Sequence, residues 1–225
     1  MPRVPRVDIK NTIYHVINRA NARLPIFFKE KDYQLFESIL ENSRERFDMR
    51  ILAYCLMPNH FHLVLWPNED NGLQRFMQRV TVTHTQRWHS QNKTIFTGHL
   101  YQGRYKSFII QEDDHLLSVI RYIERNPLRS NFVKKAENWK FSSLYRRTFP
   151  EKFKLCKRII SDWPIEVPKD YVSFVNKPQT DEEISKIRYS VNRGKPFGGQ
   201  DWTNKIVKAF GLESTIRGRG RQIKD

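Results

Sequence analysis

The sequence predicts an α+β fold in which helices pack on an antiparallel sheet. Four short apolar segments, rich in β-branched or aromatic residues, predict strands, and amphipathic helices separate most of them. Only Met57-Pro58-Asn59 lies between the second strand and the third, and so short a link joins antiparallel neighbours. The resulting order, βαββαβα, favours an antiparallel sheet with its helices on one face.

Residues that begin or end helices place these elements. Asp32 can cap the first helix, and Asn71-Gly72 opens a long second helix with an apolar stripe. A third helix starts at Asp113 or Asp114 and ends near Asn126, because a proline follows. The four strands are expected at residues 12–17, 50–56, 60–66 and 105–111.

The composition is that of a folded protein with a sizeable core. The chain has 225 residues, of which 39% are apolar and 13% aromatic, and no apolar run is long enough to span a membrane. Two cysteines, Cys55 and Cys156, are too few for a disulfide scaffold or a cysteine-based zinc site. The N-terminus lacks the apolar segment of a secretory signal, so we expect a cytoplasmic protein.

The charge balance indicates a polyanionic partner. Forty Lys and Arg residues against 24 Asp and Glu give a net charge of +16, which favours nucleic acid or an anionic membrane surface. Aromatic residues are interleaved with the basic residues of segment 131–160, a pattern that suits single-stranded or hairpin nucleic acid. Alternatively, the aromatic residues face a core. The basic residues are Lys134, Lys135, Lys140, Arg146, Arg147, Lys152, Lys154, Lys157 and Arg158.

Two histidines two residues apart form the first candidate site. His60 and His62 lie in the third expected strand, where alternate side chains share a face, so both imidazoles point the same way. Phe61 and Leu63 then point to the other face. Two imidazoles so placed can bind one divalent metal. The alternative is a solvated pair of histidines without a ligand.

The third expected helix supplies the second candidate site. Tyr122 and Asn126 are four residues apart, so they lie on the same side of the helix. Taken alone, each has an ordinary explanation. The tyrosine can be a boundary residue with its hydroxyl in water, and the asparagine can terminate the helix before Pro127.

Together these motifs resemble the REP-associated tyrosine transposases, a group within the single-tyrosine HUH transposases. The resemblance spans roughly residues 12–145, and the ordered combination is more specific than any single piece. One departure is Ala20, where the family often has glycine; this changes a turn and no catalytic residue. The segments that match are Tyr14-His15-Val16, Asn18-Arg19-Ala20-Asn21-Ala22-Arg23, Met57-Pro58-Asn59-His60-Phe61-His62, Gly103-Arg104-Tyr105-Lys106-Ser107, Tyr122-Ile123-Glu124-Arg125-Asn126-Pro127, and Trp139 with Phe141-Ser142-Ser143.

The resemblance implies a ferredoxin-like HUH endonuclease core that cleaves and rejoins single-stranded DNA at hairpin-forming, REP-like palindromes. Tyr122 would be the nucleophile and form a 5′-phosphotyrosine, while His60, His62 and Asn126 would hold Mg²⁺ or Mn²⁺. No nucleotide cofactor is expected, because the phosphotyrosine conserves the energy of the broken bond. The expected partner is DNA and not a membrane, and the expected location is cytoplasmic and nucleoid-associated.

Two other functions are compatible with parts of the pattern. A binding-only relative would recognise a hairpin without cutting it, but such a relative would be expected to have lost one of the four site residues. A rolling-circle or conjugation initiator would share the histidine pair and the tyrosine, but its usual helicase domain needs a far longer chain. The DNA sequence recognised and the oligomeric state are not predicted.

Several basic residues are candidates for DNA contacts. Arg104 and Lys106 are expected on a strand that flanks the site, where they could grip phosphates; they could equally be ordinary exposed charges. The other candidates come from the basic and aromatic segment and are Lys134, Lys135, Lys140, Arg146 and Arg147.

The expected catalytic domain covers residues 1–158, and a helical, basic extension covers residues 159–225. In the extension, Thr180 begins a capping-box helix that runs to about Arg193, and a second helix at about 202–210 ends before Gly211. This extension could be a small DNA-binding appendage, or a helical hairpin that packs on the core with a basic tail. The tail carries Arg217, Arg219, Arg221 and Lys224.

Overall fold

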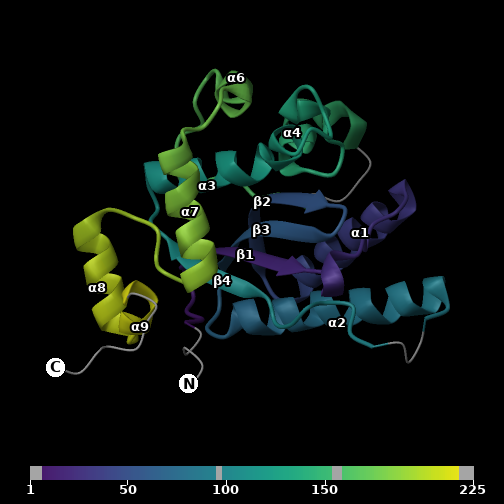
Figure 1. Ribbon diagram of the computed structural model, residues 1–225, viewed down its shortest axis with the longest axis horizontal. Coiled ribbons are helices and arrows are strands. Elements are labelled where there is room, and N and C mark those ends of the chain that lie inside the picture. The colour runs from purple at the N-terminus through teal and green to yellow at the C-terminus, as the bar shows by residue number, and fades with distance from the viewer. Residues whose placement is uncertain (1–6, 95–97, 154–158, 218–225) are drawn as a thin grey trace.

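The computed structural model describes residues 7–94, 98–153 and 159–217, and its centre is an antiparallel sheet of four strands (Figure 1). The order across the sheet is β2-β3-β1-β4, and every neighbouring pair is antiparallel. This confirms the predicted fold class. The strands are β1 (Ile13–Arg19), β2 (Met49–Met57), β3 (His60–Pro67) and β4 (Lys106–Ile110).

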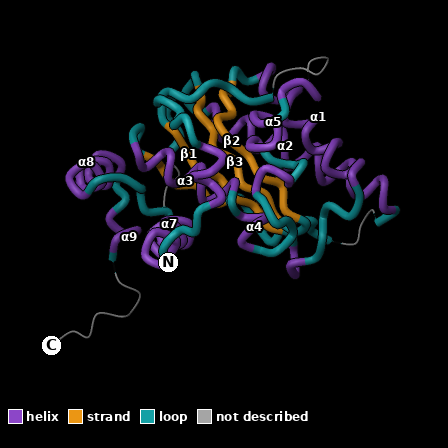
Figure 2. Tube along the Cα trace, turned by 90° about the horizontal axis from the view of Figure 1, so that it is seen from above, coloured by secondary structure: helices purple, strands orange, loops and turns teal. Residues whose placement is uncertain are grey.

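Helices cover both faces of the sheet, so the expectation that they lie on one face was wrong. One face packs against α1 (Glu30–Arg46) and α2 (Gly72–Asn92), and the other against α3 (Asp114–Glu124) and α7 (Asp181–Arg193) (Figure 2). The reason lies in the strands, which are apolar on both sides: every residue of β2 except Arg50 is buried. A sheet of this kind needs a second layer to keep water from its other face.

The register of the strands places the two histidines on one face. In β3, Phe61, Leu63 and Leu65 belong to the core beneath α1 and α2, whereas Val64 belongs to the core beneath α3. His60 and His62 share the side of Val64, because side chains alternate along a strand. The predicted alternation is therefore confirmed, and both histidines face the layer that contains α3.

Side-chain hydrogen bonds stabilise the starts of two helices, α1 and α3. Helix α1 begins at Glu30, so Asp32 is not its N-cap; instead, the Asp32 carboxylate accepts the backbone N–H groups of Phe28 and Lys29, at 2.8 and 3.0 Å. Helix α3 is capped by Asp113, whose side chain accepts the N–H of His115 at 2.8 Å. The Asp113 carboxylate satisfies a donor in the first turn of α3, and the Asp32 carboxylate satisfies two donors in the chain just before α1.

The third helix ends where the proline predicts, but a further helical turn follows it. Helix α3 ends at Glu124, and α4 (Asn126–Arg129) begins directly afterwards with Pro127 in its first turn. Proline is tolerated there because the first N–H groups of a helix have no partner in any case. The remaining helices are α5 (Ser143–Thr148), α6 (Tyr171–Asn176), α8 (Gln200–Phe210) and α9 (Glu213–Ile216), with 3₁₀ turns η1 (Asn21–Arg23), η2 (Ala136–Asn138) and η3 (Pro150–Phe153).

The described part of the extension packs on the sheet and on α3. The indole of Trp163 donates to the Leu52 carbonyl at 2.8 Å, and the Tyr171 hydroxyl donates to the buried carboxylate of Glu124 at 2.5 Å. The predicted capping box at Thr180 is present at the start of α7. Within the described ranges, no helix combines the length and the apolar character needed to cross a membrane. Six basic residues of the sequence prediction lie outside the described residues: Lys154, Lys157, Arg158, Arg219, Arg221 and Lys224.

Candidate active site

The structure brings His60, His62 and Tyr122 together and places Asn126 just beyond the end of the helix of Tyr122. The rings of His60 and His62, on β3, have centroids 5.1 Å apart, and the ring of Tyr122, on α3, meets His62 edge-to-face at 6.1 Å. Asn126 begins the next helical turn after Tyr122. Tyr122 and Asn126 are both largely buried, with exposed fractions of 6% and 7%. The histidine pair and the tyrosine therefore face each other across one interface between the sheet and α3.

Hydrogen bonds hold each of the two imidazoles through its Nδ1 atom. His60 Nδ1 lies 2.7 Å from the side-chain oxygen of Asn59, and His62 Nδ1 lies 2.9 Å from Nε2 of His15. No hydrogen bond within the described residues engages the Nε2 atom of either ring. Histidines that bind metal are held in this way, since a partner at one nitrogen orients the other toward the ion.

Burial keeps both imidazoles in the form that binds metal. It lowers the pKa of His60 to about 4 and the pKa of His62 well below its ordinary value. The nearby Arg19 and Arg129 guanidiniums lower both pKa values further. Both rings are therefore neutral near pH 7, and the neutral imidazole is the one with a lone pair for a cation.

The donor set fits a divalent cation that keeps open positions. In the described parts of the chain, no group of three His, Cys, Asp or Glu side chains is placed to hold a metal. The candidate ligands are instead two imidazole nitrogens and the amide oxygen of Asn126. Such a mixed set leaves room for waters and a phosphate oxygen, unlike a closed structural zinc site.

Arg129 is a site residue that the sequence prediction missed. Its Nη2 donates to Asn126 Oδ1 at 2.6 Å, and its guanidinium carbon lies 4.4 Å from the centre of the Tyr122 ring. An amide oxygen has two lone pairs, so Asn126 can accept this bond and still bind a cation. Helical spacing could have revealed Arg129, because it lies three residues after Asn126 and seven after Tyr122.

Two residues of β1, His15 and Arg19, lie on the same face of the sheet as the histidine pair. Their place at the site could not be inferred without the strand register. His15 is fully buried and contacts His62, and burial lowers its pKa to about 3. Arg19 pairs directly with His60 across the sheet. Directly paired residues point to the same side of an antiparallel sheet, so Arg19 belongs to the face of the two histidines.

The two candidate phosphate contacts near β4 are exposed, but they do not lie on the same element. Lys106 is the first residue of β4 and pairs with Ile17, which in turn pairs with His62. The three residues therefore form one row across the sheet, and the Lys106 side chain points to the face of His62. Arg104 precedes the strand, contrary to the prediction, and its side chain is exposed.

The five candidates from the basic and aromatic segment divide into two groups. Lys134, Lys135 and Lys140 are exposed, as contacts to a phosphate backbone require. Arg146 and Arg147, by contrast, have partners inside the protein. Arg146 contacts Glu37 at 3.0 Å and the Tyr54 hydroxyl at 2.6 Å, and Arg147 donates to the carbonyls of Leu52 and Ser161, which explains why these two are not available on the surface.

The aromatic residues of this segment also face inward. Trp139 donates to the Leu56 carbonyl at 2.9 Å, and Phe141 stacks on Tyr33 with ring centroids 3.8 Å apart. For these two residues the structure favours the alternative in which the aromatic residues face a core.

Replacing Arg146 by alanine should lower the free energy of unfolding by about 3 kcal/mol, because it leaves the carboxylate of Glu37 buried without its cation. Lys135→Ala, an exposed substitution in the same segment, should change it by less than about 0.5 kcal/mol. Urea titration of both variants measures the difference. Unchanged stability with weakened DNA binding in Arg146→Ala would instead assign this guanidinium to DNA.

Comparisons with known proteins show which family the chain resembles. The family model described as "Transposase IS200 like" matches residues 8–126. A protein of Haemophilus influenzae (strain ATCC 51907 / DSM 11121 / KW20 / Rd), assigned by name to the REP-associated tyrosine transposases, is 26% identical over 119 residues, which are 49% of this chain and 68% of that protein.

A solved structure has the same fold. It is a REP-associated tyrosine transposase bound to a REP hairpin, and it matches with a TM-score of 0.52 at 19% identity, over 75% of this chain and 94% of its own. The resemblance found in the sequence motifs is thereby confirmed. The family model covers more than half of the chain, from Asp8, ahead of β1, to Asn126, and so spans both histidines and the tyrosine. The chain belongs to the IS200-like transposase family.

Proposed function

We propose that this protein is a metal-dependent endonuclease and strand transferase for single-stranded DNA, acting at hairpin-forming, REP-like palindromes through a 5′-phosphotyrosine. The observation that carries the proposal is the meeting of Tyr122 with the His60–His62 pair on one face of the sheet. The similar solved protein is bound to a REP hairpin. That likeness supports a DNA hairpin as the partner of this chain as well.

The proposed reaction exchanges one phosphoester for another. The Tyr122 hydroxyl oxygen attacks the scissile phosphorus, the new bond joins phosphorus to the phenolic oxygen, and the bond from phosphorus to the 3′ oxygen breaks. The phenolic proton passes to solvent, and the leaving 3′ oxygen takes up a proton to become a hydroxyl. Attack by a 3′-hydroxyl on the phosphotyrosine then reverses the step and rejoins a strand.

The surrounding residues favour this reaction by their charge and orientation. The Arg129 guanidinium lies over the Tyr122 ring, where a positive charge stabilises the phenolate that develops during attack. His60, His62 and Asn126 would hold the cation, which supplies Lewis-acid stabilisation of the phosphate charge when bound. Arg19 and Lys106 share this face and would contact neighbouring phosphates.

His15 would act on the phosphate only through His62. For the Nε2 atom of His62 to bind a cation, its Nδ1 must carry the proton and donate it to Nε2 of His15. His15 would therefore fix the His62 ring in the tautomer and orientation that the site needs. This is a positioning role, since the His15 ring is fully buried.

The proposal is tested by incubating the protein with folded, single-stranded palindromic DNA from the flanks of its own gene and Mg²⁺ or Mn²⁺. We expect a cleaved strand and a covalent protein–DNA adduct that survives denaturing electrophoresis. Specific hairpin binding without either product would favour the second candidate, a binding-only relative.

Hairpin binding should depend steeply on salt. Arg104, Lys106, Lys134 and Lys135 are exposed, and each phosphate contact they make releases condensed counterions. Four such contacts would weaken binding about a hundredfold between 50 and 200 mM salt. Fluorescence anisotropy across this range measures the slope. An affinity that does not change with salt would remove these four residues from the interface.

A further inference from the structure

The proposed nucleophile lies near the end of a helix that is interrupted just after it. Tyr122 is in the last turn of α3, and Asn126 begins α4. Arg125 stands between the two helices, as the C-cap of the first and the N-cap of the second. Helix ends fray, because their last carbonyls have no partner within the helix. The geometry at Arg125 therefore decides where Tyr122 lies relative to Asn126.

Arg125 is fastened to the end of α6. Its guanidinium donates to the carbonyl of Val175 at 2.9 Å and also to the carbonyl of Asn176. These are the last two residues of α6, whose carbonyls the helix itself leaves unpaired. The interruption after Tyr122 is thus held by a helix about fifty positions further along the chain.

Arg121 binds the chain just beyond α6. It donates to the carbonyls of Lys177 and Pro178, at 2.9 and 3.1 Å. Its guanidinium carbon lies 4.1 Å from the centre of the Phe174 ring, and it forms an ion pair with Glu183 at 3.6 Å. The residue is buried, so these partners replace water around its charge. Arg121 is therefore engaged within the protein and not displayed to DNA.

Glu124 ties the same helical turn both to α6 and to the edge of the sheet. Its fully buried carboxylate accepts the hydroxyl of Tyr171 on α6 at 2.5 Å, and its other oxygen accepts the hydroxyl of Ser143. Ser143 in turn accepts the backbone N–H of Tyr54, in β2, at 2.9 Å. Burial raises the pKa of Glu124, and the two hydroxyl donors oppose that rise. The carboxylate thus joins three elements at one point.

Helix α6 is itself attached to the body of the protein. Tyr171 and Val175 belong to the apolar core beneath α3. The side chain of Asn176 accepts the backbone N–H of Ala136 at 2.9 Å. These attachments make α6 a fixed support for the last turn of α3.

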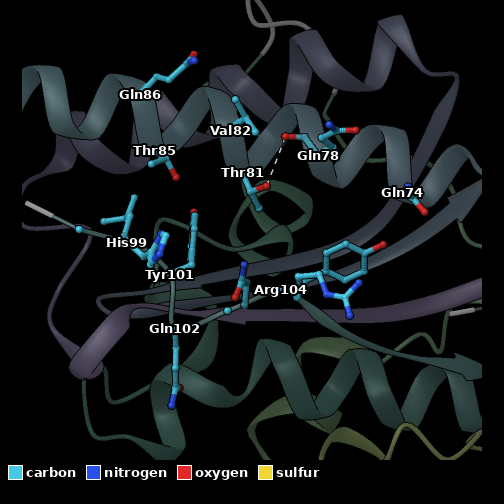
Figure 3. A pocket seen from close by; sticks show the side chains of 15 residues that line it. Gln74, Gln78, Thr81, Val82, Thr85, Gln86, His99, Tyr101, Gln102 and Arg104 are labelled. Carbon is cyan, nitrogen blue, oxygen red and sulfur yellow. Dashed lines mark hydrogen bonds between the residues drawn. The ribbon is translucent and has the colours of Figure 1, made fainter. Parts of the chain in front are cut away.

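Helix α2, on the other face of the sheet, borders a groove instead. The groove has a volume of about 1240 Å³ and separates α2 from residues 98–105; Figure 3 shows Thr85 and His99 on its two walls. The last turn of α3 differs, because its charged side chains reach α6 directly. Direct contacts of this kind hold a reacting group more precisely than a helix with space beside it.

We propose that α6 positions the nucleophile, because it fixes the helical turn that carries Tyr122 and the interruption that follows. The contacts that do so are those of Arg121, Glu124 and Arg125. The inference rests on the proposed function and gives part of the extension a role in the reaction. Displacement of a reacting group by about 1 Å can cost about a hundredfold in rate. A loosened turn should therefore slow the attack on phosphorus without weakening hairpin binding.

The test separates chemistry from binding in the full chain. Arg125→Ala should lower the single-turnover rate of adduct formation at saturating hairpin DNA at least about tenfold, with hairpin affinity unchanged. Arg125→Lys keeps a cation that reaches one carbonyl but not two, so it should restore part of the rate. The matched control is Lys169→Ala, which removes an exposed charge just before α6 and should change neither rate nor affinity.

Hydrogen exchange measures the same support without DNA. In Arg125→Ala the amides of residues 121–129 should exchange faster, while those of β1 and β3 keep their normal protection. Faster exchange throughout the sheet would indicate a general loss of stability and would overturn the local role of α6.

Two kinetic outcomes would also overturn the inference. One is an adduct that forms in Arg125→Ala as fast as in the unmodified protein. The other is weaker hairpin binding with an unchanged rate at saturation, which would assign Arg125 to DNA. Both differ from failure of the proposed function, in which the unmodified protein itself forms no adduct and the inference falls with it.

Discussion

Replacing Tyr122 by phenylalanine should eliminate the covalent DNA adduct and lower strand cleavage by at least about a thousandfold, while hairpin affinity stays the same. The substitution removes one oxygen that has no hydrogen-bond partner among the described residues, so the fold should not suffer. The ring would remain against His62 and beneath Arg129. Denaturing electrophoresis of the protein with labelled hairpin DNA measures the adduct.

The matched control for this experiment is Tyr105→Phe, at the nearest rival tyrosine in the motif Gly103-Arg104-Tyr105. Tyr105 lies between α2 and β4, and no pair of histidines contacts its ring in the described part of the chain, so its variant should form the adduct at the normal level. An adduct that survives Tyr122→Phe, or a DNA-linked peptide that maps to Tyr105, would show that the nucleophile is a different residue.

Removal of divalent metal should abolish cleavage but leave much of the charge-driven binding intact. Lewis-acid stabilisation of a phosphate is worth several kcal/mol, so excess EDTA should reduce the rate at least about a thousandfold. Added Mn²⁺ should restore it. Hairpin affinity, set by Lys and Arg contacts, should change little by comparison.

Substitution of one histidine can show whether cleavage is lost because the metal no longer binds or because the protein no longer folds. His62 is buried, so replacing it leaves a cavity, whereas His60 is partly exposed and His60→Ala is the safer variant. Calorimetric titration with Mn²⁺ should show weaker metal binding in His60→Ala than in the unmodified protein. The circular dichroism spectrum of the variant should be unchanged, which shows that its fold is intact. Full cleavage in excess EDTA would contradict the role proposed for both histidines.

Much of the fold could be predicted because short-range rules decide it. Alternation along the third strand placed His60 and His62 on one face, and Pro127 ended the helix of Tyr122. The second layer of helices was missed, although the continuous apolar run of the second strand is typical of a strand that is covered on both faces. Small helices such as α6 were missed as well, since six residues carry too weak a periodic signal.

The candidate site could be predicted only where its residues share an element. Tyr122 and Asn126 were found by helical spacing, but His15 and Arg19 join the site through strand pairing, which the sequence does not display. Arg146 shows the opposite error. The charge of Arg146 led to the prediction that it contacts DNA. Its partner Glu37 is 109 residues away in the sequence, and no local sequence pattern indicates a buried ion pair at that separation.

The packing of α3 against its own sheet has a kinetic consequence. Tyr122 and His62 lie against each other within one chain, so a single copy holds both the proposed nucleophile and the two histidines proposed as metal ligands. Arg125 of the same region is tied to the carbonyl of Val175 at 2.9 Å, which anchors the end of α3 in place. Such a chain needs no second copy to supply its tyrosine. Its activity per molecule should therefore be independent of dilution, and two inactive variants, one without the tyrosine and one without the histidine, should not repair each other when mixed.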